Sequence, residues 1–371
     1  MKIVRSTAPY IRRNSSVKRM MIDVIIALMP VVIFSIVQFG LKAVMTLGIS
    51  IFVMLLGEFV FVFLTNQIPY DGVKHKLGEK IKYAKSKATI NNITAPLISA
   101  IIYAMIMPAT YNWYHIALGA LMGIVIGKLL FGGLGSNIFN PAAVGRIATV
   151  LCFGEFLKYG DPLINHTTDV LVSGTPLGAL TDAFTNNSLG MISWKTNLDL
   201  FLGFVPGSMG EICKAAILLG ALYLIIRKSC DFRTILGTIC TFMVLMLVAG
   251  LTLKTKTNFD VDPFAFMFYQ TLSGGLIFGA VFMVTDPVTS PVTRPGRITF
   301  GALVAIIAVM IRLFGAYPEG VAFAILISNA FVPVIDYYKW STNKYNYKHA
   351  ILWSLMLIIP ALIIYFGYRG V

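Results

Sequence analysis

Apolar runs long enough to cross a lipid bilayer recur along the whole chain, and they constrain its fold more than any other feature. A hydrocarbon core of about 30 Å needs roughly 20 apolar residues in a helix, and a backbone crossing it must satisfy its own hydrogen bonds. Of the 371 residues, 57% are hydrophobic and 12% are charged, whereas a soluble domain carries about 25% charged residues. The sequence therefore predicts an all-α polytopic membrane protein with about ten transmembrane helices.

The basic residues predict how the chain is oriented. The net charge is +14, but Lys and Arg stand in short segments between apolar runs and are not interleaved with aromatic residues, so no nucleic-acid partner is expected. Residues 1–20 and the loop that contains Lys74 to Lys87 are basic, while the stretch from Glu155 to Lys195 has more acidic than basic residues. The positive-inside rule then predicts a multi-pass protein with a cytoplasmic N-terminus and an external 155–195 stretch.

Four regions follow from this pattern. They are a cytoplasmic basic N-terminus at 1–20, a first transmembrane half at 21–156, an extracytoplasmic loop at 157–196 and a second transmembrane half at 197–371. The four Cys and four His residues are scattered without metal-ligand spacing, so we expect neither a zinc site nor an iron-sulfur cluster.

Similar breaks interrupt the two halves. Gly132-Gly133-Leu134 precedes Asn140-Pro141, and Gly274-Gly275-Leu276 precedes Asp286-Pro287. Asn or Asp followed by Pro predicts a helix start with free backbone N–H groups. Paired breaks predict two inverted-repeat halves with broken or re-entrant helices around a central site, as in ammonium and urea channels. The alternative is that Gly and Pro only loosen membrane helices.

Two carboxylates fall inside apolar runs. Asp23 lies near the start of the first run and Glu58 lies deep in the second. An ionisable group inside the membrane is costly, so each is a candidate for an ion path. Pairing with a basic neighbour would explain each of them equally well.

Several segments together resemble the RnfD subunit of the Rnf electron-transport complex, a close relative of the NqrB subunit of the sodium-pumping NADH:quinone reductase. The segments that carry this resemblance are spread over most of the chain: Ala8–Arg12, Met21–Pro30, Asn140–Ala142, Phe201–Glu211 and Thr285–Pro291. The compact N-terminus favours the RnfD subunit over the quinone-reductase one.

The resemblance implies a covalent flavin in the outer loop. In these families FMN is joined through its phosphate to a Thr hydroxyl within an Asp-x-x-Ser-Gly-Ala-Thr pattern, by an extracytoplasmic flavin transferase. The corresponding residues are Asp169, Ser173, Gly174 and the acceptor Thr175, followed by Pro176 and Leu177. The Ala of the pattern is absent here, so Thr167, Thr168 and Thr181 are alternative acceptors.

The resemblance also implies a second, noncovalent flavin among the helices, riboflavin in the quinone-reductase relative. We expect the broken elements to hold it, because a flavin ring edge needs amide and backbone partners in an apolar slot. The expected residues are Asn140, Pro141, Gly145, Arg146, Ser208, Gly210, Glu211, Thr285, Asp286 and Pro287. They could instead only cap helix ends.

The implied function is electron relay in an ion-translocating ferredoxin:NAD⁺ oxidoreductase of the bacterial plasma (inner) membrane, coupled to Na⁺ or H⁺. Its implied partners are the other Rnf proteins (RnfA, RnfB, RnfC, RnfE and RnfG), the flavin transferase and the lipid bilayer. Three alternatives remain: the NqrB subunit of the quinone reductase, a cofactor-free channel or secondary transporter, and a structural scaffold.

Overall fold

A computed structural model describes most of the chain. The described residues are 17–66, 77–87, 90–133, 135–154, 197–256, 262–315, 320–337 and 341–367, and every regular element among them is helical. The first half contains α1 (Val17–Phe39), α2 (Leu41–Thr65), α3 (Leu77–Lys87), α4 (Asn91–Ile106), α5 (Trp113–Gly127), the short η1 (Leu129–Phe131) and α6 (Pro141–Phe153). The second contains α8 (Asn197–Leu202), α9 (Lys214–Arg227), α10 (Phe232–Lys256), α11 (Pro263–Leu272), α12 (Leu276–Phe278), the π-helix η5 (Gly279–Met283), α13 (Arg294–Phe314), α14 (Val321–Ile335) and α15 (Tyr347–Gly367).

The all-helical, multi-pass expectation is confirmed for the described residues, but the count of about ten spans is not. Six helices are long and apolar enough to cross a bilayer, and up to eight spans result if each of two bent helix pairs is one span. The apolar helices α6, with 13 residues, and α14, with 15 residues, are shorter than these six. The difference arises because the chain breaks several of its apolar runs, so single helices fall short of the length that spanning requires.

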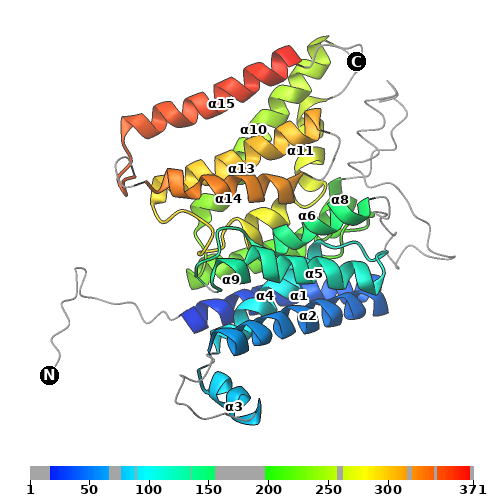
Figure 1. The fold of residues 1–371 in the computed structure, drawn as a ribbon. Helices are drawn as coiled ribbons and strands as arrows, with labels where there is room; N and C mark the ends of the chain where they lie inside the picture. The colour runs from blue at the N-terminus through cyan, green and yellow to red at the C-terminus, as the bar shows by residue number, and fades with distance from the viewer. Residues whose placement is uncertain are drawn as a thin grey trace, which may run out of the picture.

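The helices form two groups joined by a shared centre. In Figure 1, α1, α2, α4 and α5 lie on one side, and α10, α11, α13, α14 and α15 lie on the other. Contacts of α9 with α1 and of α14 with α6 are among those that connect the two halves of the chain. Close approach at the first contact depends on Gly220, where a Cβ atom would lie 2.4 Å from the Ala27 carbonyl oxygen. The centre is therefore built from segments distant in sequence.

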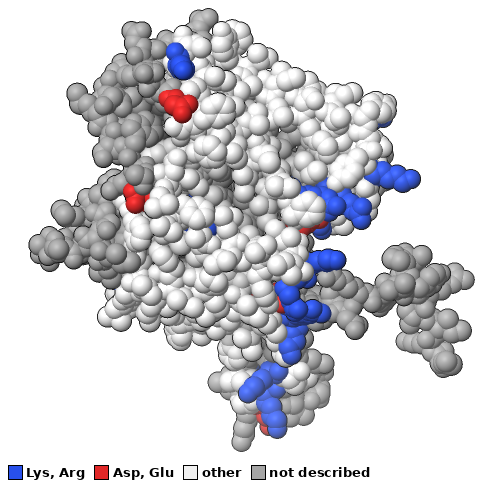
Figure 2. Space-filling model, turned by 180° about the vertical axis from the view of Figure 1, so that it is seen from behind, with Lys and Arg blue, Asp and Glu red and all other residues white. Residues whose placement is uncertain are grey.

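Positive charge gathers at one end of the helix bundle. Lys and Arg line the right edge of Figure 2, which is the left edge of Figure 1, where α1 and α15 begin. We call this the basic end; its residues are Lys18, Arg19, Arg227, Lys228, Arg233, Arg294, Arg297, Lys344 and Lys348. The lateral surface is apolar, and α15 is only 11% buried within the chain, as expected of a helix that faces lipid.

Asn140 confirms its predicted helix start, but the prediction for Asp286 is wrong. The Asn140 Oδ1 atom accepts hydrogen bonds from the backbone N–H groups of Ala142 (3.0 Å) and Ala143 (3.4 Å) at the start of α6. Asp286 forms a turn instead, accepting from the Val288 N–H (3.1 Å) and the Thr289 hydroxyl (3.2 Å).

A second proline explains the difference between these two segments. A helix that started at Pro287 would soon reach Pro291, which has no N–H to donate and clashes with the preceding turn. The next helix, α13, begins only after Thr293, whose side chain accepts from the Gly296 N–H at 3.3 Å.

The sequence also missed α3, because a short basic segment between apolar runs reads as a loop. The predicted boundary at residue 20 falls inside the first turn of α1, which begins at Val17.

Candidate cofactor site

A cavity at the basic end lies between elements of the first and second halves of the chain. It comprises about 780 Å³ of space free of atoms, part of which is open to the outside. Its walls come from α1, α4, α6, α9, η5 and the turn after η5; the lining residues are Met20, Met21, Val24, Ala95, Ile98, Ser99, Ile102, Lys128, Asn137, Asn140, Pro141, Leu224, Ser229, Cys230, Val281, Phe282, Thr285, Asp286, Pro287 and Val288. We call it the inner cavity.

The two breaks that the sequence identified meet in this cavity. Asn140 and Pro141 enter it from the first half, and Thr285, Asp286 and Pro287 enter it from the second. Half of the ten residues expected to hold a membrane flavin are thus brought to one place. The paired breaks predicted a central site, and the packing of α6 and η5 brings these five residues to one cavity.

The other five expected residues lie elsewhere. Ser208 and Glu211 line a second, smaller cavity of about 290 Å³, which Leu200 of α8 also lines. Gly210 packs against α4, with its N–H donating to the Met105 carbonyl at 2.7 Å.

Gly145 and Arg146, the remaining two, are part of the packing around α6. A Cβ atom on Gly145 would come within 3.0 Å of the Tyr103 ring. Arg146 is buried, with Nη1 3.8 Å from the Met107 sulfur. These residues therefore belong to the packing of the breaks rather than to the inner cavity.

The polar groups of the inner cavity include both donors and acceptors. Asn140 uses its carbonyl oxygen for the α6 cap, so its NH₂ group takes no part in the cap. Asn137 donates to the Phe139 carbonyl at 3.2 Å, which leaves its own carbonyl oxygen as an acceptor. Lys128, buried in the wall, contributes a cation. The surrounding walls are mostly aliphatic, and Phe282 is the one aromatic side chain among the lining residues.

Lys128 is paired with Glu58, one of the two candidate ion-path residues. Its Nζ atom lies 2.8 Å from Glu58 Oε2, and the Asn92 side chain donates to Glu58 Oε1 at 3.1 Å. Both charged groups are almost completely buried. The structure thus gives Glu58 the basic neighbour that was the alternative to an ion path.

Asp23, the other candidate, also has hydrogen-bond partners for its carboxylate. Its carboxylate accepts hydrogen bonds from the Ser229 hydroxyl (2.6 Å), the Arg227 guanidinium (3.2 Å) and the Tyr223 hydroxyl (3.3 Å). These contacts join α1 to the last turn of α9 and to the loop beyond it. Asp23 therefore fixes one wall of the inner cavity.

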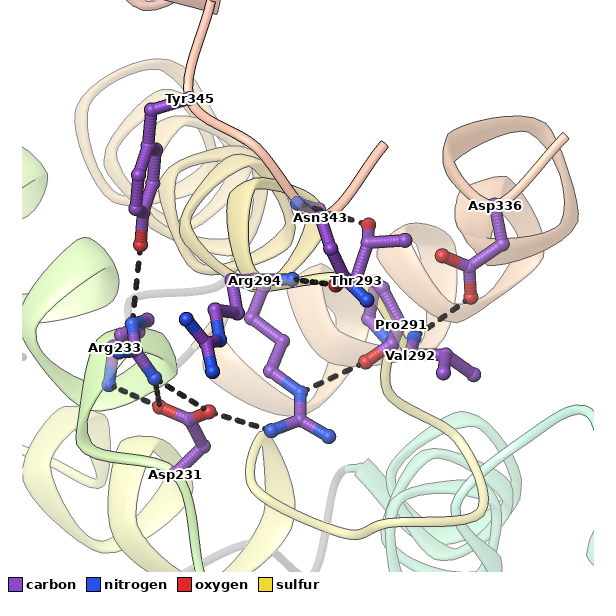
Figure 3. Close-up of polar contacts among 11 residues, drawn as sticks. Asp231, Arg233, Pro291, Val292, Thr293, Arg294, Asp336, Asn343 and Tyr345 are labelled. Carbon is purple, nitrogen blue, oxygen red and sulfur yellow. Dashed lines mark hydrogen bonds and ion pairs between the residues drawn. The ribbon is translucent and has the colours of Figure 1, made fainter. Parts of the chain in front are cut away.

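A group of ion pairs and hydrogen bonds holds the rim of the cavity. Asp231 is paired with Arg233 (Figure 3), with 3.2 Å between Asp231 Oδ2 and Arg233 Nη1. The same Oδ2 atom lies 2.5 Å from Arg297 Nη1. Arg297 also donates to the Pro291 carbonyl at 3.0 Å, in the segment that follows the Asp286 turn. Arg233 donates to the Tyr345 hydroxyl at 3.1 Å. We call Asp231, Arg233, Pro291, Arg297 and Tyr345 the rim clamp.

The contacts of the rim clamp shift the pKa of Asp231, one of its members, and contribute to the pKa of Cys230 beside it. Burial acts to raise the pKa of Asp231, but the Arg233 backbone N–H and the Arg297 guanidinium outweigh it and hold this pKa below its usual value. Burial, with a smaller contribution from the Asp231 carboxylate, raises the pKa of the Cys230 thiol to about 11. Asp231 thus stays ionised at neutral pH, and Cys230 stays protonated.

Sequence reasoning missed Lys128, Asn137, Ser99, Ser229 and Cys230 as cavity residues. Lys128 carried a usable signal, because a lone Lys at the end of an apolar run requires a buried acid such as Glu58. The others carried none, since isolated polar residues near helix ends are common. Asp169, Ser173, Gly174, Thr175, Pro176 and Leu177 lie outside the described residues, as do Thr167, Thr168 and Thr181.

Known proteins resemble this chain over most of its length. The D subunit of the proton-translocating ferredoxin:NAD⁺ oxidoreductase complex of Clostridium ljungdahlii is 32% identical over 333 residues, covering 89% of this chain and 92% of that one. The D subunit of the ion-translocating oxidoreductase complex of Alcanivorax borkumensis is 29% identical over 94% of this chain and 98% of its own.

The quinone-reductase relatives match over a smaller part. The B subunit of the Na⁺-translocating NADH-quinone reductase of Chromohalobacter salexigens is 37% identical over 252 residues, which are 66% of this chain but only 58% of that protein. The sequence model of the NQR2, RnfD, RnfE family matches residues 4–345. The chain belongs to this family, whose relatives named here are subunits of ion-translocating oxidoreductase complexes.

Proposed function

We propose that this chain is the flavin-carrying RnfD subunit of an Rnf-type ion-translocating oxidoreductase. The observation that carries the proposal is the inner cavity, where the Asn140 and Asp286 breaks meet in a member of this family. The D subunit of the Clostridium complex aligns over 92% of its length, against 58% for the quinone-reductase protein. This difference favours an RnfD role over an NqrB role.

The proposed orientation places the basic end in the cytoplasm of the bacterial plasma membrane. The positive-inside rule supports it, because Lys and Arg gather at that end. In Figure 1, α8 and the end of α6 lie toward the opposite side, and residues 155–196 connect them. Under this proposal Thr175 belongs to the external segment, where the extracytoplasmic flavin transferase would reach it.

The proposed covalent site is the Thr175 hydroxyl, joined to the phosphate of FMN. The six-residue offset from Asp169 supports this assignment, and Ser173-Gly174 directly before Thr175 is its departure from the family pattern. A second flavin, riboflavin in the quinone-reductase relative, is proposed for the inner cavity. There Asn140 would supply an N–H donor, Asn137 an acceptor oxygen, and Phe282 and Ile102 apolar surface for the flavin ring system.

The two proposed flavins would supply one-electron chemistry, and the chain would set their separation and surroundings. Helix α6 starts at the inner cavity and ends shortly before the segment that contains Thr175. Its 13 residues correspond to about 20 Å at about 1.5 Å per residue. The helix thus contributes to the distance between the proposed electron-carrying sites.

Ion coupling and the remaining partners are part of the same proposal. The two relatives are named for protons and for sodium, so the ion carried here is left as Na⁺ or H⁺. The described residues form helices only and contain no nucleotide-binding sheet, so other proteins would load and unload the electrons. The proposed partners are RnfA, RnfB, RnfC, RnfE and RnfG.

In-gel fluorescence tests the covalent flavin and separates this function from a cofactor-free channel, transporter or scaffold. The protein is expressed with the flavin transferase, denatured and run on a gel. We expect a fluorescent band that Thr175→Ala abolishes and Thr181→Ala keeps. A dark wild-type band, or a Thr175→Ala band as bright as wild type, would rule out attachment at Thr175.

A further inference from the structure

The short helix α3 differs from every other described element in its placement. It makes an angle of 85° with α4, which leads from the same end of the bundle into the apolar core. In Figure 1 it projects sideways from the bundle, beyond α2. A helix perpendicular to the spanning helices lies parallel to the plane of the bilayer.

The sequence of α3 suits the boundary between lipid and water. Lys80, Lys82 and Lys85 belong to the helix, and Glu79 is its only acidic residue. Ile81 is exposed, by 37%, although it is a large apolar side chain. Basic and apolar side chains on one short helix are typical of segments that lie on a membrane surface.

The elements next to α3 indicate which surface lies beside it. It packs against α2, and the last turns of α2 expose Phe59, Val60 and Leu64, which face lipid in a spanning helix. In a bilayer, lipid headgroups would therefore lie beside α3 at the level of the basic end. In Figure 2 the Lys side chains of this segment continue the basic edge of the bundle downward.

We propose that α3 binds the anionic headgroups of the bilayer, with its lysines on the lipid phosphates and Ile81 inserted among the acyl chain ends. The basic charge complements the negative surface of a bacterial membrane. The contact anchors the chain between α2 and α4, next to Asn92 and the Glu58–Lys128 pair. No flavin is needed for this contact.

Hydrogen exchange of the full chain in nanodiscs tests the proposal. We expect the backbone amides of residues 80–86 to exchange about tenfold more slowly in discs containing phosphatidylglycerol than in pure phosphatidylcholine. Roughly 1 M salt, where the Debye length is about 3 Å, should remove most of this difference.

Variants provide the matched control. K80Q/K82Q/K85Q should lose the lipid dependence, whereas K344Q/K348Q, two exposed lysines of the basic end outside α3, should keep it. Equal exchange in both lipids would overturn the proposal. Protection that appears only after the other Rnf proteins are added would overturn it as well, because α3 would then be a protein-docking element.

Discussion

Single residues show best how the interior of this protein tolerates charge. The carboxylates of Asp23 and Glu58 each contact a basic side chain and a neutral hydrogen-bond donor. Removing one member of such a pair leaves an uncompensated charge, while removing both leaves only a packing change. Sequence alone identified the acids but not their partners, since Arg227 is 204 residues from Asp23.

The Glu58–Lys128 pair allows a direct test of this interpretation. Glu58→Gln should destabilise the protein by about 3–5 kcal/mol because Lys128 would remain buried and unpaired. The double variant Glu58→Gln/Lys128→Met should recover most of that loss. Thermal unfolding in detergent measures both; a double variant as unstable as the single one would contradict a structural pairing.

Cys230 reports on the chemistry at the cavity rim. Its pKa of about 11 means that the reactive thiolate is scarce at neutral pH. Alkylation by a small maleimide at short reaction times should therefore become about tenfold faster for each pH unit between about pH 7 and 10. The alkylation that is lost in the Cys230→Ser variant is the alkylation of this residue. A rate that levels off near pH ~8, close to the pKa of a free thiol, would contradict the buried setting of this residue.

At the scale of the elements, the two Gly- and Pro-containing breaks show which local structure the sequence predicts and which it does not. The Asn140 cap was predictable because Asn followed by Pro is a local signal. The Asp286 turn was not, because Pro291 shortly afterwards cancels the same signal. The paired breaks predicted a central site, but the residues that complete the cavity depend on helix packing between the two halves, which local patterns do not encode.

The cap of α6 gives a prediction at this scale. Asn140→Ala should cost about 1 kcal/mol of stability, since two N–H groups lose their acceptor. Asn140→Asp keeps an acceptor for these groups and should cost less. Chemical or thermal unfolding of the three proteins measures the order, and equal loss in both variants would show that the cap is not the cause.

The rim clamp adds a dependence on pH. The pKa of Asp231 is lower in the folded protein than its usual value of about 3.9, so its stabilisation is fully present above that value. It is lost as pH falls through the lowered pKa. Asp231→Asn should thus lower the melting temperature at about pH 6, and the difference from wild type should shrink below about pH 4.

Asp262→Asn is the matched control for that experiment. Asp262 caps α11 through its side chain, and Asn is an equally good cap, so little change is expected at any pH. A melting difference for Asp231→Asn that stays constant down to the lowest pH would exclude titration of the rim clamp.

For the whole molecule, hydrophobic run length predicted the class of protein, and charge distribution predicted a polarised helix bundle. Figure 2 shows that polarity as a basic edge. The number of spans was harder to predict, because α6, α14 and the bent α11–α12 segment are apolar but too short or too bent to count alone. The inverted-repeat relation of the two halves stays a prediction, as does the flavin at Thr175.

The binding of a flavin where the two breaks meet is tested most directly by counting noncovalent flavin. Thr175→Ala removes the covalent group, and acid precipitation then releases what the cavity holds. We predict about one flavin per chain, lost in Ser99→Phe, which fills the cavity, and kept in Ile93→Phe, an exposed position on the same helix. No released flavin from the folded Thr175→Ala protein, or equal amounts from both phenylalanine variants, would contradict flavin binding in the inner cavity.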